Sequence, residues 1–225
     1  MSEKEQLDKL TAAYSVITEY IKSTYQDSFN MLEPNIRDTA TRCAQALVAT
    51  VKSEKDIYLE LKAVLSSVFP ATTESGMITQ GPIPLSSYCP HHLYPVQYEC
   101  WVSYIPESDG LVLGLSKLTR ISKLLSSRFV LQEQLASDIA DLLYLNNDNK
   151  ESMEEFSEDW YYDIGLRTVG SAVMLIGTHT CMSCRGINEP GVKTSSVELR
   201  GKYWESNLEL KFYQAVQNIR SAKTF

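Results

Sequence analysis

All three histidines of the chain stand close to cysteines, in two segments that lie far apart in the sequence. The first segment is SSYCPHHLYP, residues 86–95, and the second is THTCMSCRG, residues 178–186. Grouped cysteine and histidine residues in an intracellular chain indicate a metal or catalytic site. If both segments share one metal ion, the fold must bring them together, and this constrains its topology strongly. The candidate residues are Cys89, His91, His92, His179, Cys181 and Cys184.

The composition fits an ordinary intracellular globular protein. The 225 residues, 44% of them hydrophobic, can form one large domain or a core domain with a helical appendage. No apolar run approaches the roughly 18 residues that a membrane span needs, and the N-terminal sequence MSEKEQLDKL lacks the apolar core of a secretory signal. We therefore expect a cytoplasmic protein whose five cysteines form no disulfide framework. The net charge of −7 argues against nucleic-acid and membrane partners.

The first 70 residues are expected to be entirely helical. Apolar residues recur at spacings of three and four over residues 5–26, 36–49 and 54–68, which predicts three amphipathic helices. Ser53 is the expected N-cap of the third helix, and Pro70 is expected to end it.

The rest of the chain predicts an α+β fold. Apolar and polar residues alternate over 96–104, which predicts a half-buried strand, and a strand at 77–88 is expected to pair with it. Further elements are helices at 117–127, 131–145 and 205–220 and strands at 167–178 and 190–203. We therefore expect an N-terminal helical region at 1–72 and an α+β domain with ββααββ order at 73–225. The acidic stretch 147–163 is interpreted as a solvated surface excursion.

Two arrangements of a zinc site are possible, and they imply different proteins. A closed site has four protein ligands, as structural zinc sites do, and these are Cys89, His92, Cys181 and Cys184. An open site leaves out Cys184, and water takes the fourth position, as in catalytic zinc sites. His91 and His179 then lie beside that water as proton carriers. If residues 179–184 are extended, Cys181 and Cys184 point to opposite faces, which favours the open site.

The two middle helices add a candidate site for an anionic substrate. Residues 114–122 (GLSKLTRIS) begin a helix for which Ser116 is the expected N-cap. Helix N-termini favour anions, so cations beside one can form a phosphate site, although an ordinary basic surface turn has the same pattern. The candidate cations are Lys117, Arg120 and Arg185. Gln132 and Glu133 open the next helix, where a carboxylate can accept two hydrogen bonds from a guanine edge.

Taken together, these segments resemble the GTP cyclohydrolase I family. Its C-x-H-H-x-x-P motif is similar to residues 89–95, and its H-x-C-x-x-x-R-G motif is similar to residues 179–186. Residues 114–121 and the pair Gln132-Glu133 follow in the family's order between them. Several motifs in register over about residues 80–220 are far more specific than any one of them.

The resemblance implies a tunnelling fold, an antiparallel ββααββ core with N-terminal helices and a C-terminal helix, whose sheets join side by side into an oligomeric barrel. It implies a homo-oligomer, usually a decamer, with active sites at subunit interfaces. The substrate is then GTP and the metal is zinc. Zinc-activated water opens the imidazole ring at C8, which releases formate and gives 7,8-dihydroneopterin triphosphate.

The resemblance also implies a task for each candidate residue. The zinc ligands are Cys89, His92 and Cys181, with Cys184 outside. The proton-transfer pair is His91 and His179. The substrate contacts are Ser116 for the ribose, Gln132 and Glu133 for the guanine, and Lys117, Arg120 and Arg185 for the triphosphate.

Some features depart from the family pattern. Gln134 stands where the family usually has an arginine, and the acidic stretch 147–163 looks like an insertion. Two other interpretations remain open. The chain can be a non-catalytic assembly or regulatory protein with the closed zinc site, or a related purine or pterin enzyme such as a deazaguanine-pathway reductase.

Overall fold

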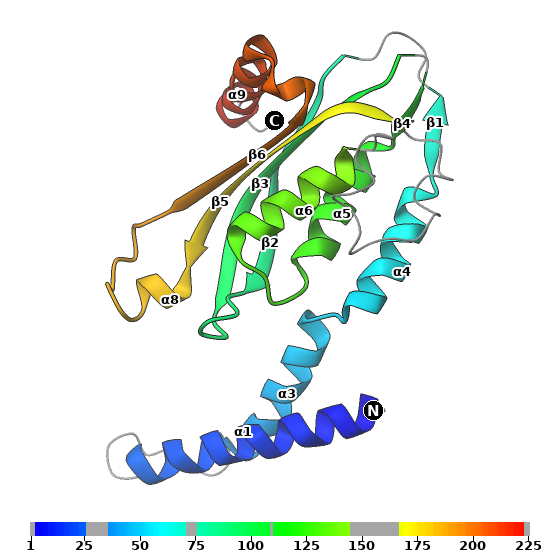
Figure 1. The fold of residues 1–225 in the computed structure, drawn as a ribbon. Coiled ribbons are helices and arrows are strands. Elements are labelled where there is room, and N and C mark those ends of the chain that lie inside the picture. Colours follow the sequence, from blue (N-terminus) through cyan, green and yellow to red (C-terminus); the bar gives the residue numbers. More distant parts are fainter. Residues whose placement is uncertain (1–2, 26–35, 71–75, 109, 145–166, 223–225) are drawn as a thin grey trace. The chain divides into compact units, whose positions relative to one another are not determined.

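The computed structural model describes residues 3–25, 36–70, 76–108, 110–144 and 167–222 (Figure 1). The chain divides into two compact units, Met1–Lys52 and Ser53–Phe225. The predicted excursion at 147–163 lies outside the described residues. Within the described part of the chain, no helix is long and apolar enough to cross a bilayer.

In the described part of the first unit, helix α1 (Glu3–Tyr25) packs against helix α3 (Thr39–Thr50). The three- and four-residue spacing of apolar side chains gives each helix one apolar side for this contact. The predicted helices at 5–26 and 36–49 are therefore confirmed to within a few residues.

The second unit opens with α4 (Glu54–Leu65), and Ser53 caps it as predicted by accepting a hydrogen bond from the Asp56 N–H at 3.2 Å. The helix ends before residue 68, so the prediction that the first 70 residues are all helical is wrong. Residues Val68–Pro70 form the short strand β1, which pairs antiparallel with β4 (Leu111–Leu113). This pairing is non-local, so helical periodicity did not reveal it.

The position of α4 also bears on the expected boundary at residue 72. The side chains of Ile57, Leu61 and Leu65 are buried in the main core of the second unit, together with residues of the sheet and of two later helices. The division between the two units accordingly falls at Lys52 and Ser53, ahead of α4.

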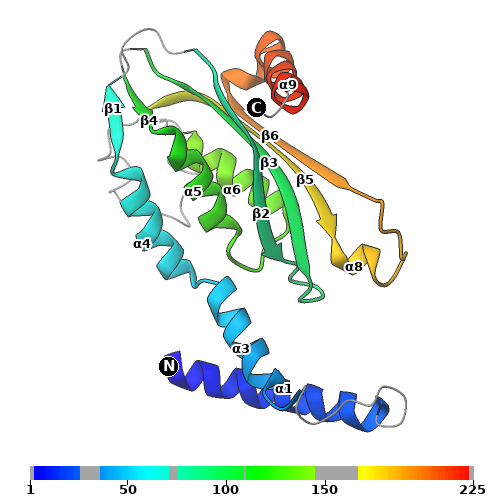
Figure 2. The same cartoon turned by 180° about the vertical axis from the view of Figure 1, so that it is seen from behind.

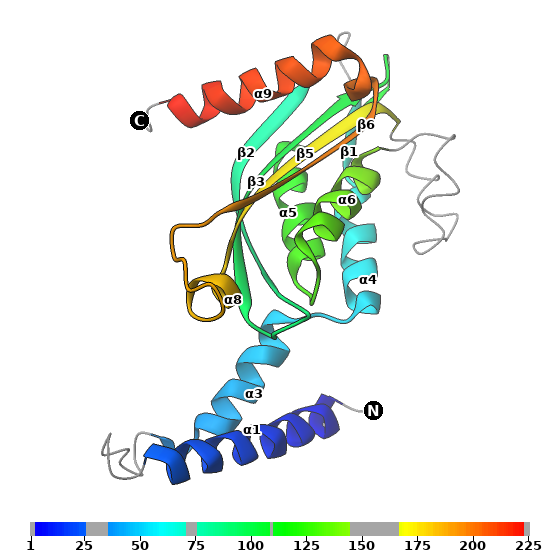
Figure 3. The ribbon, with the colours of Figure 1, turned by 60° about the vertical axis from the view of Figure 1, so that its left-hand side comes forward.

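Four antiparallel strands form the main sheet in the order β2-β3-β5-β6. They are β2 (Ile78–Tyr88), β3 (Pro95–Pro106), β5 (Thr168–His179) and β6 (Thr194–Gly201). The helices α5 (Leu115–Ser126) and α6 (Gln132–Leu143) cover one face, and α9 (Ser206–Ser221) lies on the other (Figure 3). The α+β class and the ββααββ core of a tunnelling fold are therefore confirmed. The joining of sheets into a barrel stays a prediction.

Strand β3 is buried on both faces over its second half, which corrects the prediction of a half-buried strand. Tyr98, Cys100 and Val102 face the core beneath α5 and α6, as the alternation predicts. Trp101 and Ser103 on the opposite face are also buried. Their cover comes from α9 and from Tyr203, whose hydroxyl lies 2.6 Å from the Ser103 hydroxyl.

The packing of α9 can be tested with Phe212→Ala. The Phe212 side chain has no exposed surface and packs in the cluster that contains Trp101, so the change should lower the free energy of unfolding by about 3–5 kcal/mol. Leu210→Ala is the matched control, because Leu210 lies on the same helix and is 57% exposed, and its effect should stay within about 0.5 kcal/mol. Urea unfolding at one protein concentration measures both. Equal losses would contradict the packing of α9 on the sheet.

Candidate metal centre and active site

The pairing of β3 with β5 brings the two cysteine–histidine segments to one end of the sheet. Its register places Val96 opposite His179, so the chain leaves β5 beside the start of β3. The Thr180 hydroxyl donates a hydrogen bond to the Pro95 carbonyl at 2.6 Å and ties the two segments together. The turn between β2 and β3 and the short helix α8 accordingly lie at the same end of the second unit (Figure 2).

The turn between β2 and β3 holds its residues by hydrogen bonds between backbone groups. The Cys89 N–H donates to the Tyr94 carbonyl, and the Leu93 N–H donates to the Cys89 carbonyl, each at 2.8 Å. Leu93 has a positive φ of 57°, a conformation that lets the chain reverse within a few residues. The reversal brings His92 Nδ1 to 3.7 Å from Cys89 Sγ.

After β5 the chain enters a single helical turn, α8 (Thr180–Ser183), so residues 179–184 are not extended. The premise of the alternation argument for Cys181 and Cys184 is therefore wrong. Cys184 is nevertheless outside the cysteine–histidine group, because its exposed thiol donates to the Thr180 carbonyl at 2.8 Å.

Three side chains form a group that can hold a metal ion. The ligand atoms of Cys89, His92 and Cys181 all lie within 4.8 Å of one another. In tetrahedral zinc sites with bonds of about 2.3 Å to sulfur and about 2.0 Å to nitrogen, neighbouring ligand atoms are about 3.5–3.8 Å apart. The distance of 3.7 Å between Cys89 and His92 matches this, so the donor set and its spacing fit zinc.

The pKa of the Cys181 thiol is raised by its surroundings. Burial raises its pKa, and the neighbouring Cys89 adds to the rise, while the positive charge of Arg185 opposes it. A metal ion binds the thiolate and therefore has to displace this proton. Arg185 itself is exposed and lies two residues after the end of α8.

A hollow of about 220 Å³ opens beside the group. It contains seven of the residues singled out in the sequence, namely Cys89, His91, His92, Gln132, Glu133, His179 and Cys181. Val96, Val130 and Leu131 form part of its apolar lining. The candidate site residues of three segments, 89–92, 132–133 and 179–181, thus line one small space.

The loop between α5 and α6 aligns the start of α6 with this hollow. The Tyr88 N–H donates to the Arg128 carbonyl at 3.3 Å, and the Val130 N–H donates to the Tyr88 carbonyl at 3.2 Å. The Arg128 side chain forms an ion pair with Asp138 of α6. Gln134, which replaces the usual arginine of the family, donates to the same carboxylate at 2.7 Å. The negative charge of Asp138 is therefore already neutralised.

His179 lines the hollow and is held by Gln132, with 2.8 Å between His179 Nε2 and Gln132 Oε1. Burial lowers the pKa of His179, and the nearby Glu133 carboxylate opposes this shift. The Tyr98 ring meets the His179 ring edge-on at a centroid distance of 6.1 Å. Thr194 donates to the same Gln132 oxygen at 2.7 Å. The alternation over 96–104 predicted the burial of Tyr98, but no sequence pattern predicted that Tyr98 or Thr194 contacts His179 or Gln132, because these contacts depend on the alignment of neighbouring strands.

The predicted phosphate site lies away from this cluster. Ser116 is not the N-cap of α5, because the helix begins at Leu115 with Gly114 in the capping position. The 12 residues of α5 span roughly 18 Å, and the C-terminal end of the helix leads to the loop beside β2. Ser116, Lys117 and Arg120 therefore do not line the hollow of their own chain.

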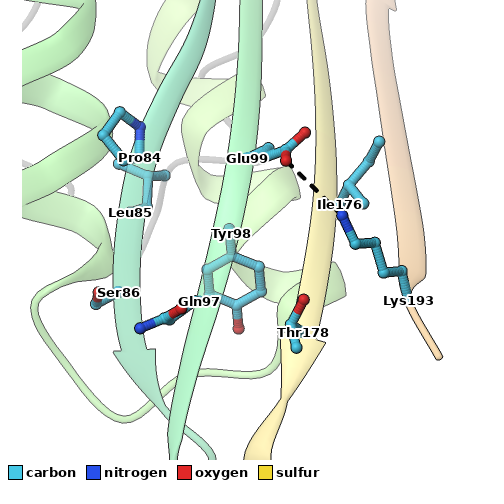
Figure 4. A pocket seen from close by; sticks show the side chains of 9 residues that line it. All are labelled: Pro84, Leu85, Ser86, Gln97, Tyr98, Glu99, Ile176, Thr178 and Lys193. Atoms are coloured by element: carbon cyan, nitrogen blue, oxygen red, sulfur yellow. Dashed lines mark ion pairs between the residues drawn. The ribbon is translucent and has the colours of Figure 1, made fainter. Parts of the chain in front are cut away.

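A second hollow, of about 320 Å³, lies over the face of the sheet that does not carry α5 and α6 (Figure 4). Polar side chains from three strands line it, including Ser86, Gln97 and Thr178. Its cation, Lys193, pairs with Glu99 at 3.8 Å. It contains none of the predicted site residues and no cysteine or histidine.

Comparison with known proteins agrees with the motifs. The sequence profile of the family described as GTP cyclohydrolase I matches residues 18–153, more than half of the chain. A protein of Streptococcus pyogenes serotype M49 named GTP cyclohydrolase 1 is 35% identical over 173 residues, which cover 73% of this chain and 78% of that protein. A Thermobifida fusca protein of the same name is 37% identical over 143 residues, 64% of this chain and 59% of that protein.

Among solved structures, the apo form of the archaeosine synthase QueF-Like covers 58% of this chain and 97% of its own, at 17% identity and a TM-score of 0.36. That likeness is too weak to bear on the fold. The profile match ends before His179 and Cys181. The position of these two residues beside Cys89 follows from the strand register and is therefore independent of the profile match. The extent of the profile match and the identity to the streptococcal protein show that the chain belongs to the GTP cyclohydrolase I family.

Proposed function

We propose that this chain is a GTP cyclohydrolase I, which opens the imidazole ring of GTP at C8, releases formate and forms 7,8-dihydroneopterin triphosphate. The observation that carries the proposal is the group of three metal-binding side chains that shares one hollow with His91, His179 and Glu133. We assign this chemistry to the second unit, Ser53–Phe225, and propose that it takes place in the cytoplasm, where reducing conditions keep the thiols free.

Zinc is the proposed cofactor, held by Cys89, His92 and Cys181. Three protein ligands leave one position for water, which is the arrangement of catalytic zinc sites. Zinc, when bound, supplies an activated water, because it lowers the pKa of a coordinated water from about 15.7 toward 7. Cys184 points its thiol at the Thr180 carbonyl, which supports the open site over the closed structural one.

The chain's own residues manage protons and orient the purine. Cleavage of the C8–N bond leaves negative charge on a ring nitrogen, so a positioned acid must protonate it. His91 and His179 are the proposed carriers, since imidazole gives and takes protons near neutral pH. The exposed carboxylate of Glu133, in the first turn of α6, can accept hydrogen bonds from guanine N1–H and the amino group.

The triphosphate is the proposed ligand of Lys117, Arg120 and Arg185, with Ser116 at the ribose. Since the first turn of α5 lies at the far end of its helix from the cysteine–histidine group, we propose that it serves the site of a neighbouring subunit. The working form is then a homo-oligomer, for which we propose the family's decamer. The first turn of α5 contains no acidic residue, which favours an anion at this helix terminus.

Purified protein supplied with zinc and GTP should release formate in step with a pterin that becomes fluorescent after oxidation. His179→Asn should lower kcat by about 100-fold or more, because a positioned acid–base group contributes roughly 10²–10⁴. Formate release and fluorescence, followed together, measure this. A zinc-loaded protein that binds GTP and yields no formate would refute the assignment.

Zinc retention separates the open site from the closed one. Cys181→Ala should lose most of the bound metal, while Cys184→Ala should keep about one zinc per chain, because only the former removes a proposed ligand. Metal analysis after gel filtration, and the thiolate absorption of cobalt-substituted protein, measure the difference. Equal metal loss in the two variants would instead favour the closed structural site.

Shared active sites can be tested by mixing inactive subunits. Cys181→Ala and Arg120→Ala chains should each be nearly inactive alone, because one lacks a metal ligand and the other a triphosphate contact. Co-expressed with different tags and purified as mixed oligomers, they should regain about a quarter of wild-type activity, as random pairing across interfaces predicts. Mixed oligomers no more active than their parents would show that α5 does not serve a neighbouring subunit.

A further inference from the structure

We propose that Gln132 is a positioning residue that fixes His179 in its Nε2–H tautomer, so that Nδ1 is the ring nitrogen that accepts a proton. The resemblance to the family assigns Gln132 to the guanine, and this proposal gives its side chain a different task. The tautomer is inferred from hydrogen bonds within the chain. The further claim that Nδ1 of this tautomer accepts a proton during catalysis rests on the proposed function.

The orientation of the Gln132 amide follows from its two carbonyl neighbours. One end of the amide lies 3.2 Å from the Thr194 carbonyl oxygen and 3.4 Å from the Leu175 carbonyl oxygen. Carbonyl oxygens only accept hydrogen bonds, so this end must be the NH₂ group, Nε2. The amide oxygen, Oε1, therefore points the other way, toward His179.

The amide oxygen then dictates the protonation of the imidazole. Gln132 Oε1 lies 2.8 Å from His179 Nε2 and 2.7 Å from the Thr194 hydroxyl. An amide oxygen has no proton to give, so both neighbours must be donors. His179 Nε2 consequently carries a hydrogen, and in the neutral ring the lone pair belongs to Nδ1.

The buried amide of Gln132 has all of its hydrogen-bonding positions occupied within the protein. Gln132 is 5% exposed, and its oxygen accepts two hydrogen bonds while its nitrogen donates two. An amide oxygen has two lone pairs and an amide NH₂ has two hydrogens, so no bonding capacity is left for guanine. The exposed neighbour Glu133 remains available for that contact.

Gly177 makes room for the arrangement. A Cβ atom at this position of β5 would collide with Gln132 Oε1 and would lie 3.0 Å from the Tyr98 ring and 3.1 Å from Gln132 Cδ. Such a contact is too close, so any larger residue at 177 would push the amide away from the strand. The close packing of Gln132 against β5 thus depends on a residue without a side chain, at a position two residues before His179.

The test uses two ways of removing the amide oxygen from His179. Gln132→Met removes it directly, and Gly177→Ala displaces it while Gln132 is kept. The matched controls are Gln134→Met, on the exposed side of the same helix turn, and Gly191→Ala, where a Cβ would meet nothing within 4 Å. If one test variant fails to fold, the other still decides the question.

The primary measurement is ¹⁵N solid-state NMR of the zinc-loaded protein with labelled histidine. Only three histidines contribute, and His91→Asn and His179→Asn assign them. We expect His179 to show a protonated Nε2 with a slowly exchanging hydrogen and an unprotonated Nδ1. This hydrogen should exchange fast in Gln132→Met and Gly177→Ala and stay protected in both controls. A protonated Nδ1 with a bare Nε2, or protection unchanged in both test variants, would overturn the proposal.

Kinetics supply a second readout that distinguishes positioning from substrate binding. A positioning role predicts that kcat falls by about 10- to 100-fold in Gln132→Met and Gly177→Ala, part of the usual contribution of an acid–base group, while KM for GTP changes less than about 3-fold. A direct guanine contact predicts instead that KM for GTP rises in both variants, because one removes the amide and the other displaces it. If the wild-type protein releases no formate from GTP, the proposed function fails, while the NMR result still decides the tautomer.

Discussion

The register between β3 and β5 is the constraint on which the rest of the site depends. It sets Val96 opposite His179 and so decides which residues of the two distant segments can meet. A slip of one residue would turn every side chain of β5 to the other face of the sheet, and His179 would leave the side on which α6 lies. The register is held by apolar side chains such as Cys100 and Leu175, which share the core under α5 and α6. Packing in the hydrophobic core therefore fixes the relative positions of the site residues.

The connections of the helical layer explain why Lys117 and Arg120 lie apart from the cysteine–histidine group. Tyr88 is bonded to Arg128 and Val130, which brings the start of α6 to the end of β2. The same loop fixes the C-terminal end of α5 there, so the first two turns of α5, with Lys117 and Arg120, lie away from the cysteine–histidine group of the same chain. One chain thus offers a cysteine–histidine group at one end and a basic helix terminus at the other. Such a division suits an assembly in which each site draws on two chains, and it lets a chain of net charge −7 attract an anion locally.

Sequence patterns predicted the parts of this protein that local chemistry decides, and they failed where distant contacts decide. The spacing of apolar residues was enough for α1, α3, α5, α6 and the four main strands, and Ser53 was identified as a cap from its residue type alone. The strands β1 and β4 were missed because each is three residues long and exists only through the other. The burial of Trp101 was missed because α9, more than a hundred residues later, provides its cover. The motifs named seven residues that do gather in one hollow, yet the helical turn at Cys181 and the separation of Ser116 from the group required the three-dimensional structure.

Gln132 illustrates how burial changes the meaning of a motif residue. A polar side chain that is 5% exposed must find its hydrogen-bond partners inside the protein, since unsatisfied buried groups are costly. Its partners here come from β5, β6 and His179, so the amide joins the sheet to the imidazole. Burial lowers the pKa of His179, which favours the neutral ring, and only a neutral ring has a tautomer to be chosen. The amide oxygen then selects between the two neutral tautomers, because it accepts a hydrogen bond only from a ring nitrogen that carries a hydrogen, and this leaves the lone pair on the other nitrogen.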